Sequence, residues 1–314
     1  MLAKLQRSNR RKKRKWLRIV LLIAGLIVLS LGVYLFSLWR SVSNALDAMH
    51  QPIRETSEKR LEEISLKKSD PFSLLLLGVD EREGDRGRSD TMIVITVNPN
   101  TESMEMVSIP RDMRTEIIGR GTLDKINHAY AFGGVEMSID TVENFFDIPI
   151  DYFIQVNMEG FKEIVDAVGG VTVENDLEFS YGGDYFPKGT VTLNGDEALN
   201  FARMRKGDSR GDFGRQLRQR QIIEAIIKEG ASLKTLTNYG DILTALGNNV
   251  KTNLTFNEMV NIQKNYKNAA KDIEQHQIEG SGATIDGIYY YIVPDEERLA
   301  LQTMLKEHLE IEQS

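Results

Sequence analysis

Six arginines lie close together in the second half of the chain, within the run FARMRKGDSRGDFGRQLRQRQ of residues 201–221. Arginine binds phosphate and carboxylate groups through planar, bidentate hydrogen bonds, whereas lysine serves equally well for solubility alone. The run therefore predicts a binding site for an anionic ligand. A solvated helix face with salt bridges is the simpler alternative. The arginines are Arg203, Arg205, Arg210, Arg215, Arg218 and Arg220.

The spacing of these arginines brings several of them to one side of their segment. Arg203 and Arg205 are two positions apart and would share one face of an extended segment. Arg215, Arg218 and Gln219 stand at i, i+3 and i+4 and would share one face of a helix.

Two carboxylates and another arginine occur at the ends of short apolar runs. Asp80 ends the first run, Asp90 immediately precedes the second, and Arg111 follows the third. If the runs are strands that alternate in direction, these three residues lie at the same edge of a sheet. Arg82 and Arg88 belong to the loop between the two aspartates. Turn chemistry is the alternative for each aspartate alone, but their convergence with Arg111 favours a site.

Carboxylates beside arginines suit a polyphosphate that is handled with a divalent cation. Mg²⁺ prefers oxygen ligands and is commonly held by one or two carboxylates together with substrate phosphates. Asp80 and Asp90 are therefore the expected ligands of Mg²⁺ or Mn²⁺. The arginines would stabilise charge on the departing phosphate, and a spare aspartate would act as base toward an acceptor hydroxyl.

Other catalytic arrangements are absent from the sequence. The chain has no cysteine, no P-loop motif, and four histidines without the spacing of zinc ligands. Direct in-line transfer is therefore simpler than a covalent intermediate.

The runs that position the aspartates are residues 73–79, 91–97 and 104–109. Their short connectors favour an antiparallel meander, because a parallel crossover needs a dozen or more residues. Helical and strand patterns alternate afterwards, which indicates an α/β domain with a central mixed sheet packed with helices. Helices are expected at 135–146, 159–168, 195–203, 213–230, 234–246, 255–272 and 294–312, strands at 152–157, 171–175 and 286–293, and a Gly/Tyr-rich loop at 180–189.

The start of the chain predicts a membrane anchor. Residues 19–39 hold no charged side chain, and about 20 apolar residues in a helix span a hydrocarbon core. Basic residues without an acid precede this run, which places the N-terminus in the cytoplasm and the rest outside the cell. The expected parts are a cytoplasmic tail (1–18), a transmembrane helix (19–39), an extracellular stalk (40–70) and an extracellular catalytic domain (71–314).

Charge and cysteine content narrow the partners of the outer part. Residues 1–40 contain ten of the 39 basic residues and no acid, so the remainder carries 29 basic and 46 acidic residues, a net charge of −17. This balance argues against nucleic acid as a partner. A large exported domain without cysteine fits a bacterial cell surface. Because the domain faces away from cytoplasmic nucleotides, a lipid-linked pyrophosphate in the membrane is the natural donor.

At these residues the sequence resembles the LytR–CpsA–Psr family, and its MRKGDSRGDFGR form is most similar to the wall-teichoic-acid ligases of Gram-positive bacteria. The matching pieces are LLLGVDER (75–82), GRSDT (87–91), SIPRD (108–112), DKINHAYA (124–131), VDAVGGVTV (165–173) and ALNFARMRKGDSRGDFGRQLRQRQ (198–221).

The resemblance implies a three-layer αβα domain that transfers a glycopolymer from undecaprenyl pyrophosphate to peptidoglycan. The new bond would be a phosphodiester to the six-position hydroxyl of N-acetylmuramic acid, and the polyprenyl tail would occupy an apolar tunnel. Asp80 and Asp90 match the family's magnesium-binding and acceptor-activating carboxylates. The residues that match its pyrophosphate-binding positions are Arg111, Arg203, Arg205, Arg215 and Arg218, with Gln219 beside them and Arg82 and Arg88 nearby.

One motif departs from the family pattern. Many members have a compact D-S-D-F-G-R, whereas here Arg210 and Gly211 separate Asp208 from Asp212; neither aspartate is assigned a role. The alternatives to a transferase are a hydrolase of lipid pyrophosphates, with water as acceptor, and a non-catalytic regulator or binding protein of the envelope.

Overall fold

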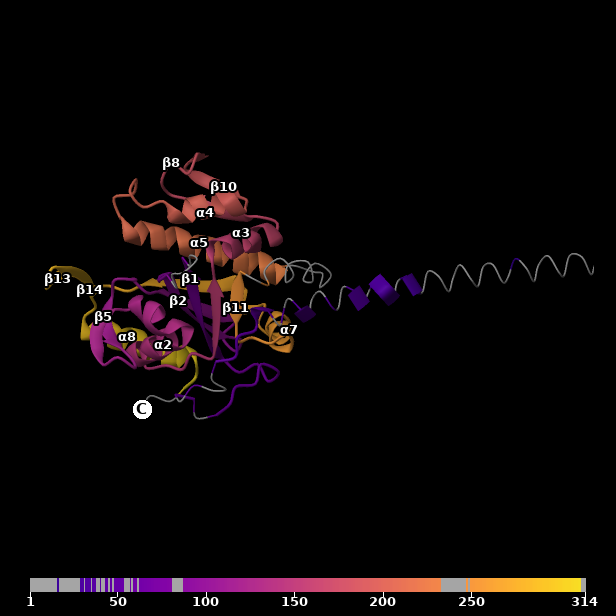
Figure 1. Ribbon diagram of the computed structural model, residues 1–314, viewed down its shortest axis with the longest axis horizontal. Helices are drawn as coiled ribbons and strands as arrows, with labels where there is room; N and C mark the ends of the chain where they lie inside the picture. The colour runs from indigo at the N-terminus through magenta and orange to yellow at the C-terminus, as the bar shows by residue number, and fades with distance from the viewer. Residues whose placement is uncertain are drawn as a thin grey trace, which may run out of the picture.

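A six-stranded mixed sheet, in the order β11-β6-β1-β2-β3-β12, forms the centre of the molecule (Figure 1). The computed structural model describes residues 62–80, 87–232 and 249–311 continuously, with residue 247 and scattered residues between 16 and 60. The strands are β1 (Phe72–Val79), β2 (Ser89–Asn98), β3 (Ser103–Ser108), β6 (Tyr152–Val156), β11 (Val250–Thr252) and β12 (Asp272–Gln277).

The predicted meander is confirmed. Strand β2 pairs antiparallel with both β1 and β3, while β6 is parallel to β1 and β12 is parallel to β3. Both faces of β1 are covered, because Leu75 and Leu77 belong to one core cluster whereas Leu74 and Leu76 pack against another. Burial on both faces explains why this strand is almost continuously apolar.

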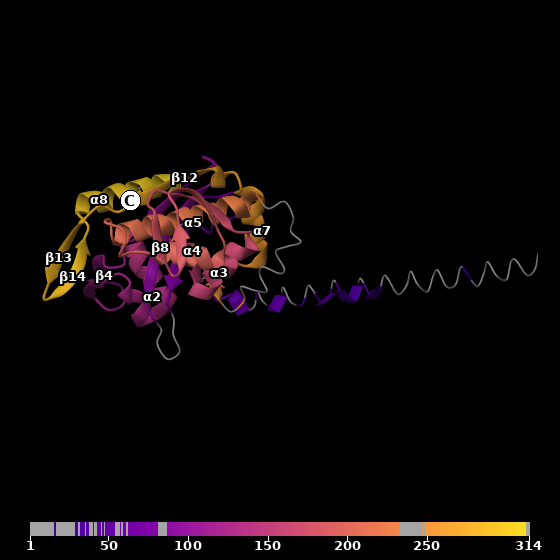
Figure 2. The ribbon, with the colours of Figure 1, turned by 90° about the horizontal axis from the view of Figure 1, so that it is seen from above.

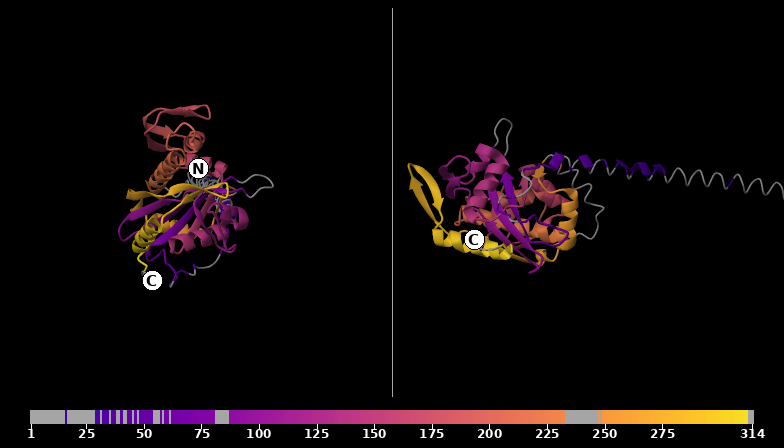
Figure 3. Two further views of the ribbon diagram at one scale, coloured as in Figure 1. Left: turned by 90° about the vertical axis from the view of Figure 1, so that its left-hand side faces the viewer. Right: turned by 90° about the horizontal axis from the view of Figure 1, so that it is seen from below.

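Helices pack on both faces of the sheet (Figures 1 and 2). One face carries α2 (His128–Phe146) and α8 (Asp295–His308), whose apolar residues join Leu75 and Leu77 in one cluster. The other face is covered by α3 (Met158–Ala167), α4 (Gly195–Arg203) and α5 (Asp212–Ser232). Helix α7 (Phe256–Asn265) and the short 3₁₀ helix η2 (Ala269–Lys271) pack on this face too, in the cluster that includes Leu74 and Leu76. A view from the side shows these layers separately (Figure 3).

Local signals set where several helices begin. The side chain of Asn157 accepts a hydrogen bond from the Gly160 amide at the start of α3. Asn194 and Glu197 form a reciprocal capping box at the start of α4. Both arrangements satisfy amide groups that a helix cannot pair internally. Helix α2 begins at His128, earlier than the predicted residue 135.

Four two-stranded sheets surround the centre. The region 180–189, predicted as a loop, contains a hairpin, which the positive φ angles of Gly182 and Gly183 allow to turn tightly. Its apolar positions are buried, since Phe179 and Phe186 stack against Phe201 of α4. The pairs are β4 (Arg114–Ile117) with β5 (Thr122–Lys125), β7 (Val171–Asn175) with β10 (Gly189–Leu193), β8 (Phe179–Tyr181) with β9 (Asp184–Phe186), and β13 (Ser281–Ile285) with β14 (Ile288–Ile292).

Two other predicted elements differ in extent. The helix expected over 255–272 ends at Asn265, and residues from Asp272 onward form strand β12 because they pair with β3. The strand expected at 286–293 is β14, paired with β13 in a hairpin that the prediction missed. The helix predicted at 234–246 lies outside the described residues.

The expected stalk, residues 40–70, packs on the domain where the structure describes it. Met49 and Leu66 are buried in apolar clusters, and the buried hydroxyl of Ser57 donates a hydrogen bond of 2.7 Å to Glu143. These contacts tie the segment to the sheet and to α2.

The predicted membrane span, residues 19–39, lies largely outside the described residues. Among the residues that are described, no helix has the length and apolar character needed to cross a bilayer.

Candidate functional site

The polar ends of the first three strands meet at one edge of the sheet, as the meander predicts. Asp80 directly follows β1, Asp90 lies at the start of β2, and Arg111 follows β3. Nη1 of Arg111 donates a hydrogen bond to Oδ1 of Asp90 at 2.8 Å. The Asp80 amide reaches back to the Arg88 carbonyl at 3.4 Å, which closes the connection between the two strands.

A cavity of about 490 Å³ opens beside these residues. It lies between β1, β2 and β6 on one side and α3, α4 and α5 on the other. Five residues predicted to form the site line one part of it: Asp80, Asp90, Arg203, Arg215 and Gln219. The structure therefore brings together residues from three separate parts of the sequence.

The remaining wall of the cavity is almost entirely apolar. Strands and helices contribute aliphatic side chains, so this part offers few hydrogen-bonding groups. Such a surface suits a hydrocarbon. Its main residues are Leu74, Leu76, Ile95, Ile154, Val156, Phe161, Ile164, Leu199, Ile223, Ile226 and Ile227.

Helix α5 runs along the whole cavity and sets its polarity. Arg215, Gln219, Ile223 and Ile227 recur every four residues and line the wall in that order. At 1.5 Å per residue, Arg215 and Ile227 are about 18 Å apart along the axis. The cavity thus has a charged end at the start of α5 and an apolar end near its C-terminus.

Arg215 is held at the charged end by an aspartate on its own helix. Its Nη2 lies 2.8 Å from Oδ1 of Asp212, which is also 3.7 Å from Nε of Arg205. Burial lowers the pKa of Arg215. The negative charge of Asp212 acts to raise this pKa, and the positive charge of Arg111 acts to lower it further. Nε of Arg215 is buried without a hydrogen-bond partner among the residues that the structure describes. A bound anion would supply an acceptor and a counter-charge there.

Arg111 has a different electrostatic balance. Burial acts to lower its pKa, but the hydrogen bond to Asp90 and the charges of Asp212 and Asp112 raise the pKa above its ordinary value. Arg111 therefore keeps its positive charge and orients the Asp90 carboxylate at the edge of the cavity.

Three arginines of the predicted set are exposed: Arg88, Arg203 and Arg205, of which Arg205 does not line the cavity. Arg203 lines the cavity from the end of α4, and no carboxylate of the described chain lies within ion-pair distance of it. Arg88 is exposed just before β2 and does not line the cavity. Arg82 lies outside the described residues.

Arg218 lies elsewhere, contrary to its predicted place in the pyrophosphate site. Its side chain is 1% exposed, and its guanidinium donates to the Asp208 carboxylate at 2.7 Å and to the Met204 carbonyl at 2.5 Å. Arg218 does not line the cavity. Arg218 links the first half of α5 to the segment that follows α4. It therefore stabilises the position of helix α5, which carries Arg215 and Gln219.

Asp208 is the buried partner of this support. Hydrogen bonds from Arg210 and Arg218 hold the pKa of Asp208 far below its usual value, despite burial. Arg210 also pairs with Asp176 at 2.5 Å. Arg210 and Asp208 thus join the α4–α5 connection to the end of β7.

Three residues of the cavity wall were missed from the sequence: Thr91, Asn157 and Tyr181. Thr91 directly follows Asp90, so its proximity was available as a signal. Tyr181 belongs to the Gly/Tyr-rich stretch, whose hairpin was not recognised. Asp212, which was given no role, lies between Arg205 and Arg215.

A separate cluster of titratable groups occurs on β3 and β12. Glu105, Glu274 and His276 have ligand atoms within 4.8 Å of one another, and His276 Nε2 lies 2.5 Å from Glu105 Oε2. None of the three lines the cavity. The hydrogen bond to Glu105 raises the pKa of His276.

Comparisons with known proteins identify the family of the chain. The chain matches the model of the LytR_cpsA_psr family over residues 36–307. It is 53% identical over 305 residues to the polyisoprenyl-teichoic acid–peptidoglycan teichoic acid transferase TagU of Bacillus subtilis, covering 97% of this chain and 99% of TagU.

Solved structures are also similar. A crystal structure of the transcriptional regulator EF0465 from Enterococcus faecalis has a TM-score of 0.74 at 41% identity and covers 80% of this chain and 92% of its own. A structure of TagT bound to LI-WTA has a TM-score of 0.72 at 32% identity, covering 83% of this chain and all (100%) of TagT.

Proposed function

This chain belongs to the LytR_cpsA_psr family, and we propose that it transfers an anionic glycopolymer, wall teichoic acid, from an undecaprenyl-pyrophosphate carrier to peptidoglycan. The relatives at 53% and 55% identity are named teichoic acid transferases, which supports a transferase acting on this class of polymer. Helices on both faces of the mixed sheet agree with the three-layer arrangement that the family resemblance implies.

One observation carries the proposal: the cavity is apolar along most of its wall and charged at one end. A lipid pyrophosphate has the same division, with a hydrocarbon tail and a compact anionic head. The tail would lie against Leu74, Ile154, Ile223 and neighbouring aliphatic side chains. The pyrophosphate would lie at Arg203 and Arg215.

The charged end matches the needs of phosphoryl transfer. Arg203 projects into the cavity unpaired by any carboxylate of the described chain, and the buried Nε of Arg215 has an unused hydrogen. Guanidinium groups neutralise non-bridging phosphate oxygens and stabilise charge on a leaving phosphate. Arg205 does not line the cavity; its side chain is 52% exposed and lies 3.7 Å from Asp212, and it would contact the same group from outside.

The donor set at this end fits a divalent cation. Asp80 and Asp90 both line the cavity at neighbouring strand ends, and Mg²⁺ commonly takes one or two carboxylates with substrate phosphates as its other ligands. Asp80 and Asp90 would hold Mg²⁺ or Mn²⁺, which when bound would neutralise the pyrophosphate oxygens. The hydrogen bond from Arg111 occupies Oδ1 of Asp90 and fixes its carboxylate plane.

The proposed reaction exchanges a phosphoanhydride bond for a phosphoester bond. The six-position hydroxyl of N-acetylmuramic acid forms a bond to the phosphorus nearest the glycopolymer, and the P–O–P bond to the carrier breaks. The hydroxyl proton passes to an aspartate carboxylate, and undecaprenyl monophosphate leaves with the bridging oxygen. Residues 19–39 would anchor the enzyme in the cell membrane, with the N-terminus cytoplasmic and the domain outside, where donor and acceptor meet.

The test is transfer by the full-length purified chain given lipid-pyrophosphate-linked saccharide, peptidoglycan oligomers and Mg²⁺. Linked product should form, and a chelator, Asp90→Asn and Arg203→Ala should each strongly reduce its rate of formation. Unchanged turnover in both variants would refute the assignment. Release of lipid phosphate without linked product, with and without peptidoglycan, would instead identify a hydrolase.

A further inference from the structure

The segment that connects the predicted span to β1 is fastened to the sheet at its beginning. Met49 is 3% exposed and forms an apolar cluster with Val156 and Val250, against which Leu46 also packs. His50 pairs with Thr252 of β11, and the amide of residue 51 donates to the Thr252 carbonyl at 2.8 Å. The chain therefore joins the edge of the central sheet as soon as it reaches the domain.

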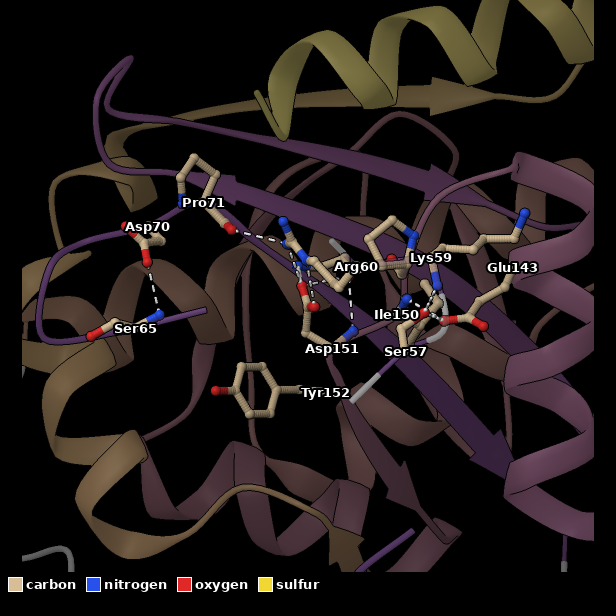
Figure 4. A network of polar contacts seen from close by, with 12 residues as sticks. Ser57, Lys59, Arg60, Ser65, Asp70, Pro71, Glu143, Ile150, Asp151 and Tyr152 are labelled. Atoms are coloured by element: carbon tan, nitrogen blue, oxygen red, sulfur yellow. Dashed lines mark hydrogen bonds and ion pairs between the residues drawn. The ribbon is translucent and has the colours of Figure 1, made fainter. Parts of the chain in front are cut away.

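The same segment is fastened again ten residues later. Nε and Nη2 of Arg60 donate to the two carboxylate oxygens of Asp151 at 2.8 and 2.7 Å, and the two side chains are only 8% and 5% exposed (Figure 4). Asp151 also accepts from the Ser73 amide at 2.8 Å. Because Asp151 immediately precedes β6, the two attachments lie at opposite ends of that strand. Residues 46–60 are called the strap below.

The strap touches the outside of the cavity wall. Leu76, Ile154, Phe161 and Ile164 pack against the cluster that contains Met49, and all four also line the cavity. Four of the side chains that would contact a bound hydrocarbon therefore also support the strap.

The apolar end of the cavity faces the side on which the chain arrives. At the start of α5, Phe213 contacts Tyr291 of β14, whereas Ile227 near its C-terminus packs with Tyr266 and Ala270 beside α7. In both Figure 1 and Figure 2 the described N-terminal residues, in indigo, extend away on the α7 side, opposite the β13–β14 hairpin.

The distance from the predicted span to the strap is short. Seven positions separate residue 39 from Leu46, and the described residues between 40 and 49 are helical. Seven residues of any conformation span at most about 25 Å. A bilayer that holds residues 19–39 would thus lie close to the strap and to the apolar end of the cavity.

We propose that the strap holds the apolar end of the cavity at the membrane surface, so that the polyprenyl chain of the donor enters the cavity directly from the bilayer past Leu46 and Met49. The identity of this lipid rests on the proposed function; the placement rests on the contacts of the strap. Leu46 and Met49 are positioning residues, since they pack against apolar side chains of the cavity wall and do not touch the reacting atoms.

The first experiment maps where the tail lies. The full-length chain is reconstituted in phosphatidylglycerol vesicles with undecaprenyl monophosphate that carries a photoreactive diazirine on an isoprene in the middle of its chain, and adducts are located by mass spectrometry. Adducts are expected within residues 46–50 and 154–164. Adducts within the cavity or elsewhere that leave 46–50 unlabelled overturn the entry route. Absence of any adduct on the cavity wall overturns the lipid assignment of the proposed function as well.

The second experiment separates entry from catalysis. Ten Gly/Ser residues inserted after Arg40 should lower transfer from an undecaprenyl donor in vesicles at least tenfold, because the strap no longer meets the bilayer. Transfer from a water-soluble donor with two isoprene units should stay unchanged, which also shows that the domain is folded. Leu46→Gln should reduce labelling of 46–50, with Leu46→Met as matched control. An equal fall with both donors, or an undiminished vesicle rate, overturns the proposal.

Discussion

Arg111 and Asp90, 21 positions apart in the sequence, are joined by a hydrogen bond of 2.8 Å that links the end of β3 to the start of β2. Asp90 lines the cavity, whereas Arg111 contacts Asp90 and does not line the cavity. The carboxylate is thus oriented by a group that itself keeps its charge, because Asp90, Asp212 and Asp112 raise the pKa of Arg111 against the effect of burial.

Replacing Asp90 by Asn should reduce transfer at least a hundredfold while the protein stays folded. The amide keeps the size of the side chain but loses the charge that a cation or an acceptor proton requires, and acid–base groups typically contribute about 10²–10⁴-fold. Initial transfer rates at saturating Mg²⁺ measure this. Asp295→Asn is the matched control, because Asp295 pairs with Arg298 at 3.0 Å on α8 and does not line the cavity; an equal loss in the control would contradict the role of Asp90.

Arg203→Ala should lower transfer by about 10²–10³-fold, the usual cost of losing one group that stabilises developing charge. Because Arg203 is exposed and unpaired with any carboxylate of the described chain, the melting temperature should scarcely change. Arg120→Ala serves as control, since Arg120 lies over the Phe132 ring at 4.0 Å and outside the cavity. Wild-type turnover in Arg203→Ala would exclude pyrophosphate contact by this residue.

Arg218→Ala should act mainly on stability. Removing one partner of a buried ion pair costs about 3–5 kcal/mol, and the loss here should be near about 3 kcal/mol because Asp208 keeps Arg210. Urea unfolding of the purified chain would measure the change. Unchanged stability with weaker donor binding would instead mean that Arg218 contacts the ligand directly.

The His276–Glu105 pair predicts a pH dependence of stability. The hydrogen bond to Glu105 raises the folded-state pKa of His276, so its contribution is complete below the unfolded value of about 6.5 and is lost as pH rises through the folded pKa. Arg220 opposes the shift and Glu274 supports it. The free energy of unfolding should therefore fall more steeply above pH 6.5 in the wild type than in His276→Gln or Glu105→Gln. Parallel curves would show that the pair makes no linked contribution.

Ile223→Trp should narrow the cavity between its charged and apolar ends. The larger ring would occupy space next to Ile227 and Ile95, so binding of undecaprenyl monophosphate should weaken at least tenfold. Overpacking typically costs about 1–3 kcal/mol, so circular dichroism should still show a folded protein. Leu299→Trp, on the exposed side of α8, should bind the lipid normally. Unchanged affinity in Ile223→Trp would mean that the tail lies elsewhere.

Much of the fold was predictable because its signals are local. The apolar runs of β1, β2 and β3, with turn residues between them, require short antiparallel connections, and such connections bring Asp90 and Arg111 to the same edge of the sheet. The β8–β9 hairpin was not predictable in the same way, because its Phe179 and Phe186 are buried by contact with Phe201, which is distant in the sequence.

The arginine run shows where such prediction ends. Helix periodicity correctly placed Arg215 and Gln219 on one wall, yet Arg218 and Gln219 are separated by about 100° around the helix axis. Gln219 faces the cavity, whereas Arg218 faces the buried Asp208. Periodicity describes angles around a helix, but the packing of neighbouring elements decides which angle faces a ligand.

By itself the sequence determined the charge of the chain, its apolar N-terminal run, the strand order of the meander and the chemical types available for an anionic site. Only the tertiary structure decided that Arg218 supports the site instead of lining it, that the apolar side chains of three helices and three strands enclose a cavity, and that residues 46–60 are fastened along β6. The reason is physical. Composition and spacing act over a few residues, whereas burial, cavities and paired charges arise from contacts such as Arg60 with Asp151, which are 91 positions apart.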